Sequence, residues 1–402
     1  MSYSYASIVP LIGGETIAMQ NVFGKRPEHI MSYEAFQAND SQLLNYYNNE
    51  VPYQFLDNYT GSLQEVDVVN TVCPCAGLSM LNVNANANAD ANNWMFESAD
   101  YVLKTVKPKV FWGENAPGLY GSMGEPVVKK LRKIGQEYGY TFLLYKTRSN
   151  LHGIGQVRNR SFYFFFKDEA TPIFDYVEKP MEKIEDIIRN AFVSDDDPMN
   201  ALVNDKKPSD DPWYKYVLEK LEGGITHPEF FEKLESSTNP MNYIESVEGN
   251  YVNAAKWFDE NGYPKQAERC RIIDAKYAAG GNVMKRCTEL GKGHTSAFVG
   301  HFATQLAHPD EDRYISIREA LSIMKMPKDF QLQGGRKNLN MICQNVPVCT
   351  AQDMAANVLK YLEGGCDIMQ TDFIKQNNTN KTIEYVNNTT TLDEFFIDNN
   401  SK

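Results

Sequence analysis

Residues 69–79 read VNTVCPCAGLS and continue a short apolar run, residues 66–69, of strand length and β-branched composition. The proline and glycine that follow end this run, so the pattern predicts a buried strand leading into a loop. Pro74 restricts the backbone immediately before Cys75. A cysteine at the carboxyl end of a parallel strand lies where open α/β sheets bind ligands, so Cys75 is a candidate nucleophile. On this stretch alone, Cys73 and Cys75 are equally well explained as ordinary buried thiols.

Two later stretches also predict strands that carry polar side chains at one end. Residues 107–119 (KPKVFWGENAPGL) predict a strand that runs into a turn and carries Glu114. Residues 153–166 (GIGQVRNRSFYFFF) predict a loop and then an aromatic strand, with Arg158 and Arg160 at alternate positions. Alternation places both arginine side chains on one face. Taken singly, Glu114 could cap a helix and the arginines could form a charged strand edge.

The order Pro-Cys, Glu-Asn and Gln-x-Arg-x-Arg resembles that of the DNA (cytosine-5) methyltransferase family. The resemblance spans most of the chain and implies a flipped-out cytosine surrounded by Cys75, Glu114 and Arg160, with Arg158 supporting the pocket. It also implies a DNA contact at Ser79. Three C-terminal stretches are similar to the last two motifs of the family: residues 313–320 (RYISIREA), 326–330 (MPKDF) and 344–347 (QNVP).

The first residues predict the opening βα unit of a nucleotide-binding fold. Residues 6–20 (ASIVPLIGGETIAMQ) read as a short strand, a Gly-Gly turn and a helix start, whose N-terminus can receive a negative group. A second strand near residues 29–31 precedes Glu34, at the spacing where an acid holds a ribose hydroxyl. The resemblance implies S-adenosyl-L-methionine as the cofactor, and we expect it to be bound by Leu11, Ile12, Gly13, Gly14, Glu34, Asp57, Pro74 and Asn345.

This opening unit is also where the chain departs most from the family. The first family motif has an aromatic residue and an additional glycine where Val9 and Leu11 stand here. The third motif has an acid before the cysteine strand, and Asp57 is its counterpart in this chain. The departures concern the cofactor pocket and leave the catalytic residues unchanged.

The resemblance implies an α/β fold, with a Rossmann-like S-adenosylmethionine-dependent catalytic domain and a smaller inserted target-recognition domain. We expect residues 1–166 and 309–371 to form the discontinuous catalytic domain and residues 167–308 the recognition domain. The alternation of strands and helices stops after Phe166. The polar residues 372–402 predict a disordered tail. Residues 82–93 (NVNANANADANN) correspond to the loop that closes over DNA in the family, although a plain flexible connector has the same composition.

Length and composition fit a soluble globular protein of 402 residues, 42% hydrophobic and 23% charged. No apolar run is long enough to cross a membrane, and the N-terminus lacks the regions of a signal peptide. Seven dispersed cysteines favour a reducing compartment. We therefore expect a monomeric protein in the cytoplasm of a bacterium or a phage-infected host. His294, His301 and His308 fit no standard zinc spacing, so we expect loop histidines facing solvent or DNA and no metal.

The net charge of -12 opposes binding to DNA, but the charge is unevenly distributed. Residues 171–260 carry 20 acids against 9 bases, whereas residues 261–300 carry 3 acids against 7 bases. Within this basic stretch, Lys285, Arg286 and Lys292 are candidate DNA contacts. The alternative is a solvated helix surface, which most charge runs are.

The expected function is transfer of a methyl group to carbon 5 of cytosine in double-stranded DNA, as part of a restriction-modification system or a phage genome. Two alternatives belong to other classes. A DNA-binding homologue without catalysis is favoured by the altered Gly-Gly motif but opposed by intact Cys75, Glu114 and Arg160. An enzyme similar to thymidylate synthase, acting on free dCMP, would need no recognition domain, so the long insert at residues 167–308 speaks against it.

Overall fold

A nine-stranded sheet forms the centre of the computed structural model, which describes residues 3–57, 64–73, 76–78, 86–300 and 302–385. Its strands are β1 Tyr5–Ile8, β2 Ile30–Ser32, β3 Tyr53–Phe55, β4 Val68–Thr71, β5 Val110–Asn115, β6 Thr141–Arg148, β9 Asn159–Phe166, β14 Phe373–Asn377 and β15 Thr382–Tyr385. They lie in the order β15-β14-β6-β9-β5-β4-β1-β2-β3.

The direction in which strands are added reverses at β1. The chain first adds β2 and β3 on one side of β1, then returns to add β4 and β5 on the other side. These pairings are all parallel, whereas β9 lies antiparallel between β5 and β6. The carboxyl ends of β1 and β4 therefore flank a topological switch point, which is where open α/β sheets bind ligands.

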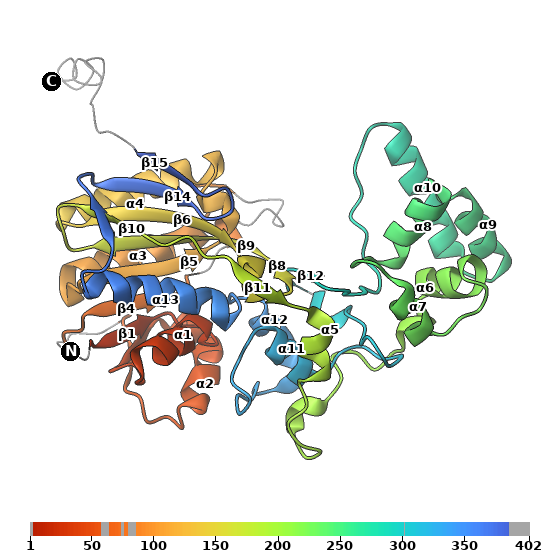
Figure 1. The fold of residues 1–402 in the computed structure, drawn as a ribbon, viewed down its shortest axis with the longest axis horizontal. Coiled ribbons are helices and arrows are strands. Elements are labelled where there is room, and N and C mark those ends of the chain that lie inside the picture. Colours follow the sequence, from red (N-terminus) through yellow and green to blue (C-terminus); the bar gives the residue numbers. More distant parts are fainter. Residues whose placement is uncertain (1–2, 58–63, 74–75, 79–85, 301, 386–402) are drawn as a thin grey trace.

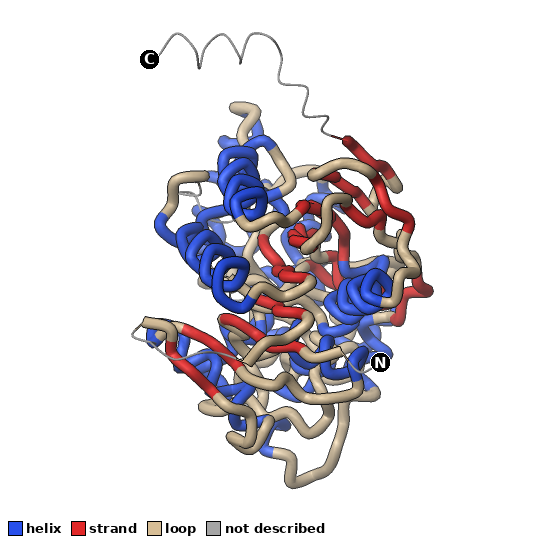
Figure 2. Tube along the Cα trace, turned by 90° about the vertical axis from the view of Figure 1, so that its left-hand side faces the viewer, coloured by secondary structure: helices blue, strands red, loops and turns tan. Residues whose placement is uncertain are grey.

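Helices cover both faces of the sheet, as Figure 2 shows. One face packs against α1 (Gly14–Phe23), α2 (Gln37–Tyr46) and α13 (Val348–Leu362), and α1 lies directly against α13. The other face packs against α3 (Asn93–Tyr101) and α4 (Glu125–Glu137). Each face has a hydrophobic core of its own, which is the architecture expected from the Rossmann-like pattern.

The aromatic strand β9 contributes to both cores by simple alternation. Phe162, Phe164 and Phe166 belong to the core beneath α1 and α13, whereas Tyr163 and Phe165 belong to the core beneath α3 and α4. All five side chains are fully buried. A strand covered on both faces reads as a continuous apolar run, which explains the dense aromatic sequence.

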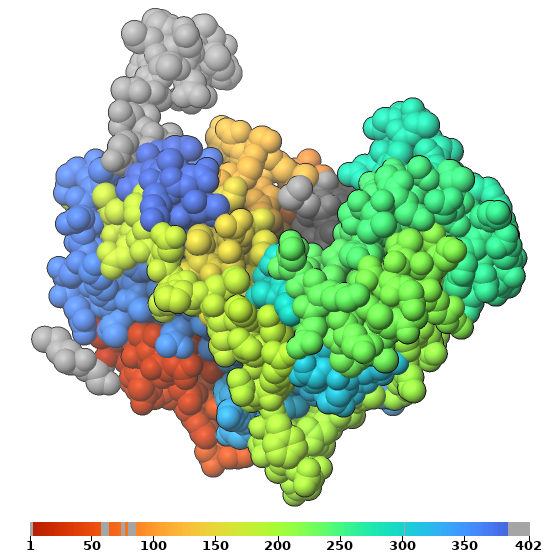
Figure 3. All heavy atoms as spheres, turned by 45° about the vertical axis from the view of Figure 1, so that its right-hand side comes forward, coloured from red at the N-terminus to blue at the C-terminus, as the bar shows by residue number. Residues whose placement is uncertain are grey.

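A second, helical unit comprises residues 212–290 and has a separate core. Its helices are α6 (Pro212–Tyr216), α7 (His227–Lys233), α8 (Pro240–Glu248), α9 (Val252–Glu260) and α10 (Pro264–Ala278). It stands to one side of the sheet in Figure 1, and Figure 3 shows a hollow between the two. Over the residues that the structure describes, no helix has the length and apolarity needed to cross a bilayer.

Short strand pairings join the segments that lead to and from the helical unit. β7 (His152–Ile154) pairs with β11 (Lys179–Glu182), β8 (Gln156–Val157) with β12 (Thr295–Ser296), and β10 (Thr171–Ile173) with β13 (Asp367–Met369). The helix α5 (Ile184–Arg189) packs on α11 (Ile317–Ile323). Residues 171–189 are thus bound to the sheet side, and the separate helical core begins later than residue 167.

The polar C-terminal segment is a correction to the sequence prediction of a disordered tail after residue 371. β14 pairs with β6 and β15 pairs with β14, which extends the sheet at that edge. Phe373 and Ile374 are buried, and the buried amide of Gln376 exchanges hydrogen bonds with Phe174. Amide side chains that look suited to solvent are satisfied inside the fold, so composition alone was misleading. Residues 386–402 lie outside the described part.

Candidate active site

Two of the candidate catalytic residues meet at the carboxyl end of β5 and the start of β9. Glu114 is on β5, and Arg160 is on the neighbouring strand β9. Cys75 follows β4, but Cys75, Pro74 and Ser79 lie outside the described residues, so their predicted roles stay predictions. The last described residue before Cys75 is Cys73, two residues beyond the end of β4.

Cys73 is a buried thiol with local hydrogen-bond partners, which agrees with the alternative that it is an ordinary buried cysteine. It is 1% exposed, and its Sγ lies 3.3 Å from Thr71 Oγ1 and 3.6 Å from Ser98 Oγ. Burial raises the pKa of the Cys73 thiol, which disfavours the nucleophilic thiolate. Cys73 therefore does not suit the role of nucleophile.

Glu114 is a buried carboxyl group, 1% exposed, that forms an ion pair with Arg160. Alternation along β5 and β9 explains the meeting, because Glu114 lies on the face of Trp112 and Arg160 on the face of Phe162, both in the core beneath α1. Burial raises the pKa of Glu114, although the charges of Arg160 and Arg158 act to lower it. The net effect is a pKa above the ordinary value of a glutamate, which favours the protonated form of Glu114 relative to an exposed glutamate.

Arg158 binds two backbone segments that are distant in the sequence. Its guanidinium donates to the carbonyl oxygen of Phe298 at 2.5 Å and to that of Cys343 at 2.8 Å. The side chain is fully buried. The structure brings Glu114, Arg158 and Arg160 together, and the roles predicted for them stay predictions.

The loop after β1 keeps a glycine-like geometry without the additional glycine of the family motif. Val9 and Leu11 have φ of 49° and 53°, and Gly13, which caps α1, has φ of 92°. Non-glycine residues seldom adopt this left-handed region, so the loop is strained at both positions. The Leu11 N–H donates to Asp40 Oδ1 at 3.1 Å, which helps to hold the loop. Ile12 is fully buried.

Two expected cofactor residues, Glu34 and Asp57, lie side by side. Glu34 follows β2, and its backbone N–H donates to Asp57 Oδ2 at 2.9 Å. The Glu34 side chain is exposed. The carboxylate of Asp57 thereby fixes the backbone from which Glu34 projects at the carboxyl edge of the sheet.

Glu15, which was not among the residues predicted from the sequence, contacts Asn345. Asn345 Nδ2 donates to Glu15 Oε2 at 2.5 Å across 330 residues of chain, and both side chains are buried. A Cβ at Gly14 would lie 3.1 Å from Asn345 Cβ, so glycine permits this close packing. The signal in the sequence was a single acid directly after the Gly-Gly turn, at the start of a helix that continues with the largely apolar residues 16–19 (TIAM).

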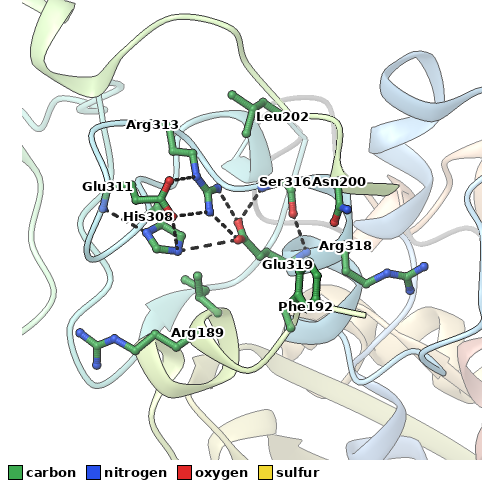
Figure 4. A pocket seen from close by; sticks show the side chains of 12 residues that line it. Arg189, Phe192, Asn200, Leu202, His308, Glu311, Arg313, Ser316, Arg318 and Glu319 are labelled. Carbon is green, nitrogen blue, oxygen red and sulfur yellow. Dashed lines mark hydrogen bonds and ion pairs between the residues drawn. The ribbon is translucent and has the colours of Figure 1, made fainter. Parts of the chain in front are cut away.

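A pocket of about 320 Å³ lies where residues 188–202 approach residues 308–319, and Figure 4 shows its lining. Its arginines are neutralised by acids: Arg189 lies 2.6 Å from Asp310, Arg313 lies 2.8 Å from Glu319, and Arg318 lies 2.6 Å from Asp197. Ser316 and Glu319 also cap α11. The motif at residues 313–320 therefore connects the two segments through internal ion pairs, and its arginines are not available to bind an anion.

His308 is buried at this junction, which corrects the expectation of a loop histidine facing solvent or DNA. It is 5% exposed, and its Nδ1 accepts hydrogen bonds from the backbone N–H groups of Asp310 and Glu311. Burial lowers the pKa of the His308 imidazole. His294 is partly exposed, and His301 lies outside the described residues.

The three candidate DNA contacts of the basic stretch differ in their surroundings. Lys285 forms an ion pair with Glu245, and Lys292 donates to the Phe231 carbonyl oxygen at 3.4 Å. Arg286 is exposed, and none of the described residues gives it a carboxylate partner. Of the three side chains, Arg286 is therefore the one most available to bind a phosphate.

Comparison with known proteins adds family and fold information. The family model for C-5 cytosine-specific DNA methylase matches residues 7–360. The type II methyltransferase M.NgoPII of Neisseria gonorrhoeae is 22% identical over 312 residues, which cover 75% of this chain and 79% of that protein.

Two solved structures share the fold at low sequence identity. A prophage-encoded protein of E. coli, described as a DNA modification methyltransferase, has a TM-score of 0.56 and 13% identity. That match covers 90% of this chain and 100% of the other. The methyltransferase EhMeth of Entamoeba histolytica has a TM-score of 0.53 and 10% identity, with 90% and 99% covered. These likenesses agree with the Rossmann-like fold.

Proposed function

The chain belongs to the C-5 cytosine-specific DNA methylase family and is a DNA (cytosine-5-)methyltransferase, and from this premise we propose its mechanism. It transfers a methyl group from S-adenosylmethionine to carbon 5 of a cytosine flipped out of double-stranded DNA, through a covalent bond between Cys75 and carbon 6. The observation that carries the proposal is the buried ion pair of Glu114, on the strand β5 beside β4, with Arg160, on the next strand β9.

The chemistry needs a nucleophile, because carbon 5 of an aromatic cytosine is itself a poor one. Addition of the Cys75 thiolate to carbon 6 makes carbon 5 electron-rich, and a proton from Glu114 at N3 supports that addition. Arg160 holds the ring carbonyl oxygen, while Arg158 holds the surrounding backbone. After methylation, loss of the carbon-5 proton expels the thiolate and restores the ring. A paired base cannot reach such buried groups, so base flipping follows.

The residues at the switch point suit S-adenosylmethionine, which supplies the electrophilic methyl group when bound. The amide oxygen of Asn345 is buried without a hydrogen-bond partner among the described residues, so this position calls for a donor. Glu34 projects at the edge where a ribose is held, and Gly13 and Gly14 open α1. The other proposed cofactor contacts are Leu11, Ile12, Asp57 and Pro74, and Ser79 is a proposed DNA contact.

We expect purified protein to bind S-adenosylmethionine and S-adenosylhomocysteine in titration calorimetry. Glu34→Gln should weaken both by about tenfold, because the ribose hydroxyl loses a charged acceptor. Glu137→Gln is the matched control, since Glu137 is an exposed acid on α4 of the opposite face. Absence of binding at millimolar ligand would favour the homologue without catalysis.

The second experiment tests the substrate. Protein incubated with labelled methyl donor should transfer label to plasmid DNA and not to free dCMP. Label in dCMP would support the nucleotide-level enzyme, and label in neither substrate would support a DNA-binding protein without catalysis.

We propose that residues 167–308 recognise the target and that the basic stretch within them contacts DNA phosphates. Replacing Lys285, Arg286 and Lys292 together by alanine should flatten the salt dependence of DNA binding by about one unit per lost contact. Arg286→Ala should account for most of this, because Lys285 and Lys292 have internal partners.

The matched control for these basic residues is Lys256→Ala. Lys256 is an exposed residue of α9, and this helix lies on the side of the helical unit away from the sheet (Figure 1). An unchanged salt slope in the triple variant would identify the basic stretch as solvated surface.

A further inference from the structure

The buried amide of Asn345 has one satisfied end and one unsatisfied end. Its Nδ2 donates to Glu15 Oε2 at 2.5 Å, whereas its Oδ1 has no partner among the described residues. The side chain is only 1% exposed, so water does not readily replace the missing donor. A buried acceptor left without a donor costs free energy, which makes this atom a ready recipient for a donor from a ligand.

Glu15 determines which end of the amide is satisfied. Its oxygens accept from Asn345 Nδ2 and, at 3.5 Å, from the backbone N–H of Val346. An asparagine amide presents a donor at one end and an acceptor at the other, so holding the donor end on Glu15 directs the acceptor elsewhere. The contact with Glu15 therefore fixes the orientation of the Asn345 amide.

The position of this pair points to the cofactor site. Glu15 lies in the first turn of α1, immediately after Gly13 and Gly14 at the switch point. Burial, together with the charge of Glu114, raises the pKa of Glu15 to about 8. Glu114 in turn interacts with Arg160 and Arg158, so the pair is electrostatically linked to the proposed base pocket. In both protonation states an oxygen of Glu15 remains able to accept from Asn345.

We propose that Glu15 is a positioning residue of the cofactor site, which orients the Asn345 amide so that Oδ1 accepts a hydrogen bond from the ammonium group of the cofactor. The inference rests on the proposed function. It adds a residue and a chemical requirement: the ligand must carry a donor in its amino-acid portion. A nucleoside thioether without that portion does not use the Glu15 contact.

The test measures ligand affinity by calorimetry in the full chain, with two probes. For S-adenosylhomocysteine, which has the ammonium group, Glu15→Met should weaken binding by about tenfold or more. For 5′-methylthioadenosine, which lacks it, the affinity should stay unchanged. Glu289→Met is the matched control, because Glu289 is a partly buried carboxyl that also accepts from an asparagine amide, Asn239, but lies in the helical unit. It should alter neither affinity.

A double-mutant cycle separates positioning from a merely structural role. If Glu15 acts through Asn345, Glu15→Met should have no further effect on S-adenosylhomocysteine affinity in an Asn345→Ala background. Additive effects, or equal weakening of both probes, would overturn the proposal. If Glu15→Met does not fold, as judged by thermal unfolding, Glu15→Leu, which also lacks an acceptor for Asn345 Nδ2, replaces it in the same cycle. If the wild-type protein binds neither S-adenosylmethionine nor S-adenosylhomocysteine, the proposed function itself is contradicted.

Discussion

Cys75→Ser is expected to abolish the covalent attachment of the protein to DNA that carries 5-fluorocytosine at the target. After addition to carbon 6 and methylation at carbon 5, release requires loss of the carbon-5 substituent as a cation. A proton can leave in this way and fluorine cannot, so the wild-type protein should remain attached to the fluorinated DNA. The complex should require the methyl donor and survive denaturing electrophoresis. Serine has no accessible anion near neutral pH, so the adduct should disappear completely.

Cys73→Ser is the matched control for this experiment. Cys73 is 1% exposed, and burial raises the pKa of its thiol, so its removal should leave the adduct intact. Peptide mapping of the wild-type adduct should identify Cys75. An adduct on Cys73 or another thiol would make the assignment of the nucleophile wrong. If no adduct forms on DNA that is demonstrably bound, the proposed mechanism fails.

Glu114→Gln is expected to slow methyl transfer by roughly 10²–10⁴, the usual contribution of a positioned general acid. Glutamine keeps the shape of the side chain but cannot release a proton to N3. The effect should appear in single-turnover rates on DNA, with cofactor affinity retained. Because the change leaves the buried Arg160 without its carboxylate, thermal unfolding must be measured alongside.

The pH dependence of the methyl-transfer rate is a second test of the role proposed for Glu114. Burial raises the pKa of this carboxyl above its ordinary value, so the protonated form that donates to N3 persists to higher pH than in an exposed glutamate. The rate should therefore fall as pH rises through the Glu114 pKa, and Glu114→Gln should lose that descending limb. A descending limb that persists unchanged in Glu114→Gln would assign the proton donor to another group. Glu289→Gln, a second carboxyl with a raised pKa, should keep the wild-type profile.

Short-range patterns in the sequence were sufficient for the local elements and for the order of the catalytic motifs. The alternation of Phe162 to Phe166 indicated a buried strand, and the Gly-Gly turn indicated the start of α1, because both depend on neighbours in the chain. The approach of Glu114 to Arg160 was also predictable, since the resemblance orders the motifs that carry them. The C-terminal strands were not, because their amides are satisfied by partners such as Phe174, about 200 residues away.

Apart from the approach of Glu114 to Arg160, only the tertiary structure decided which distant polar groups meet. Glu15 contacts Asn345 because α1 packs on the segment that begins α13, and Arg158 reaches Phe298 and Cys343 because the chain returns to the sheet after the helical unit. A periodicity reports which face of an element is buried but not which distant element covers it. Sequence by itself therefore determined most of the local elements and the order of the catalytic motifs. Packing decided the partners, since a buried hydrogen bond depends on where two separate backbones come to lie.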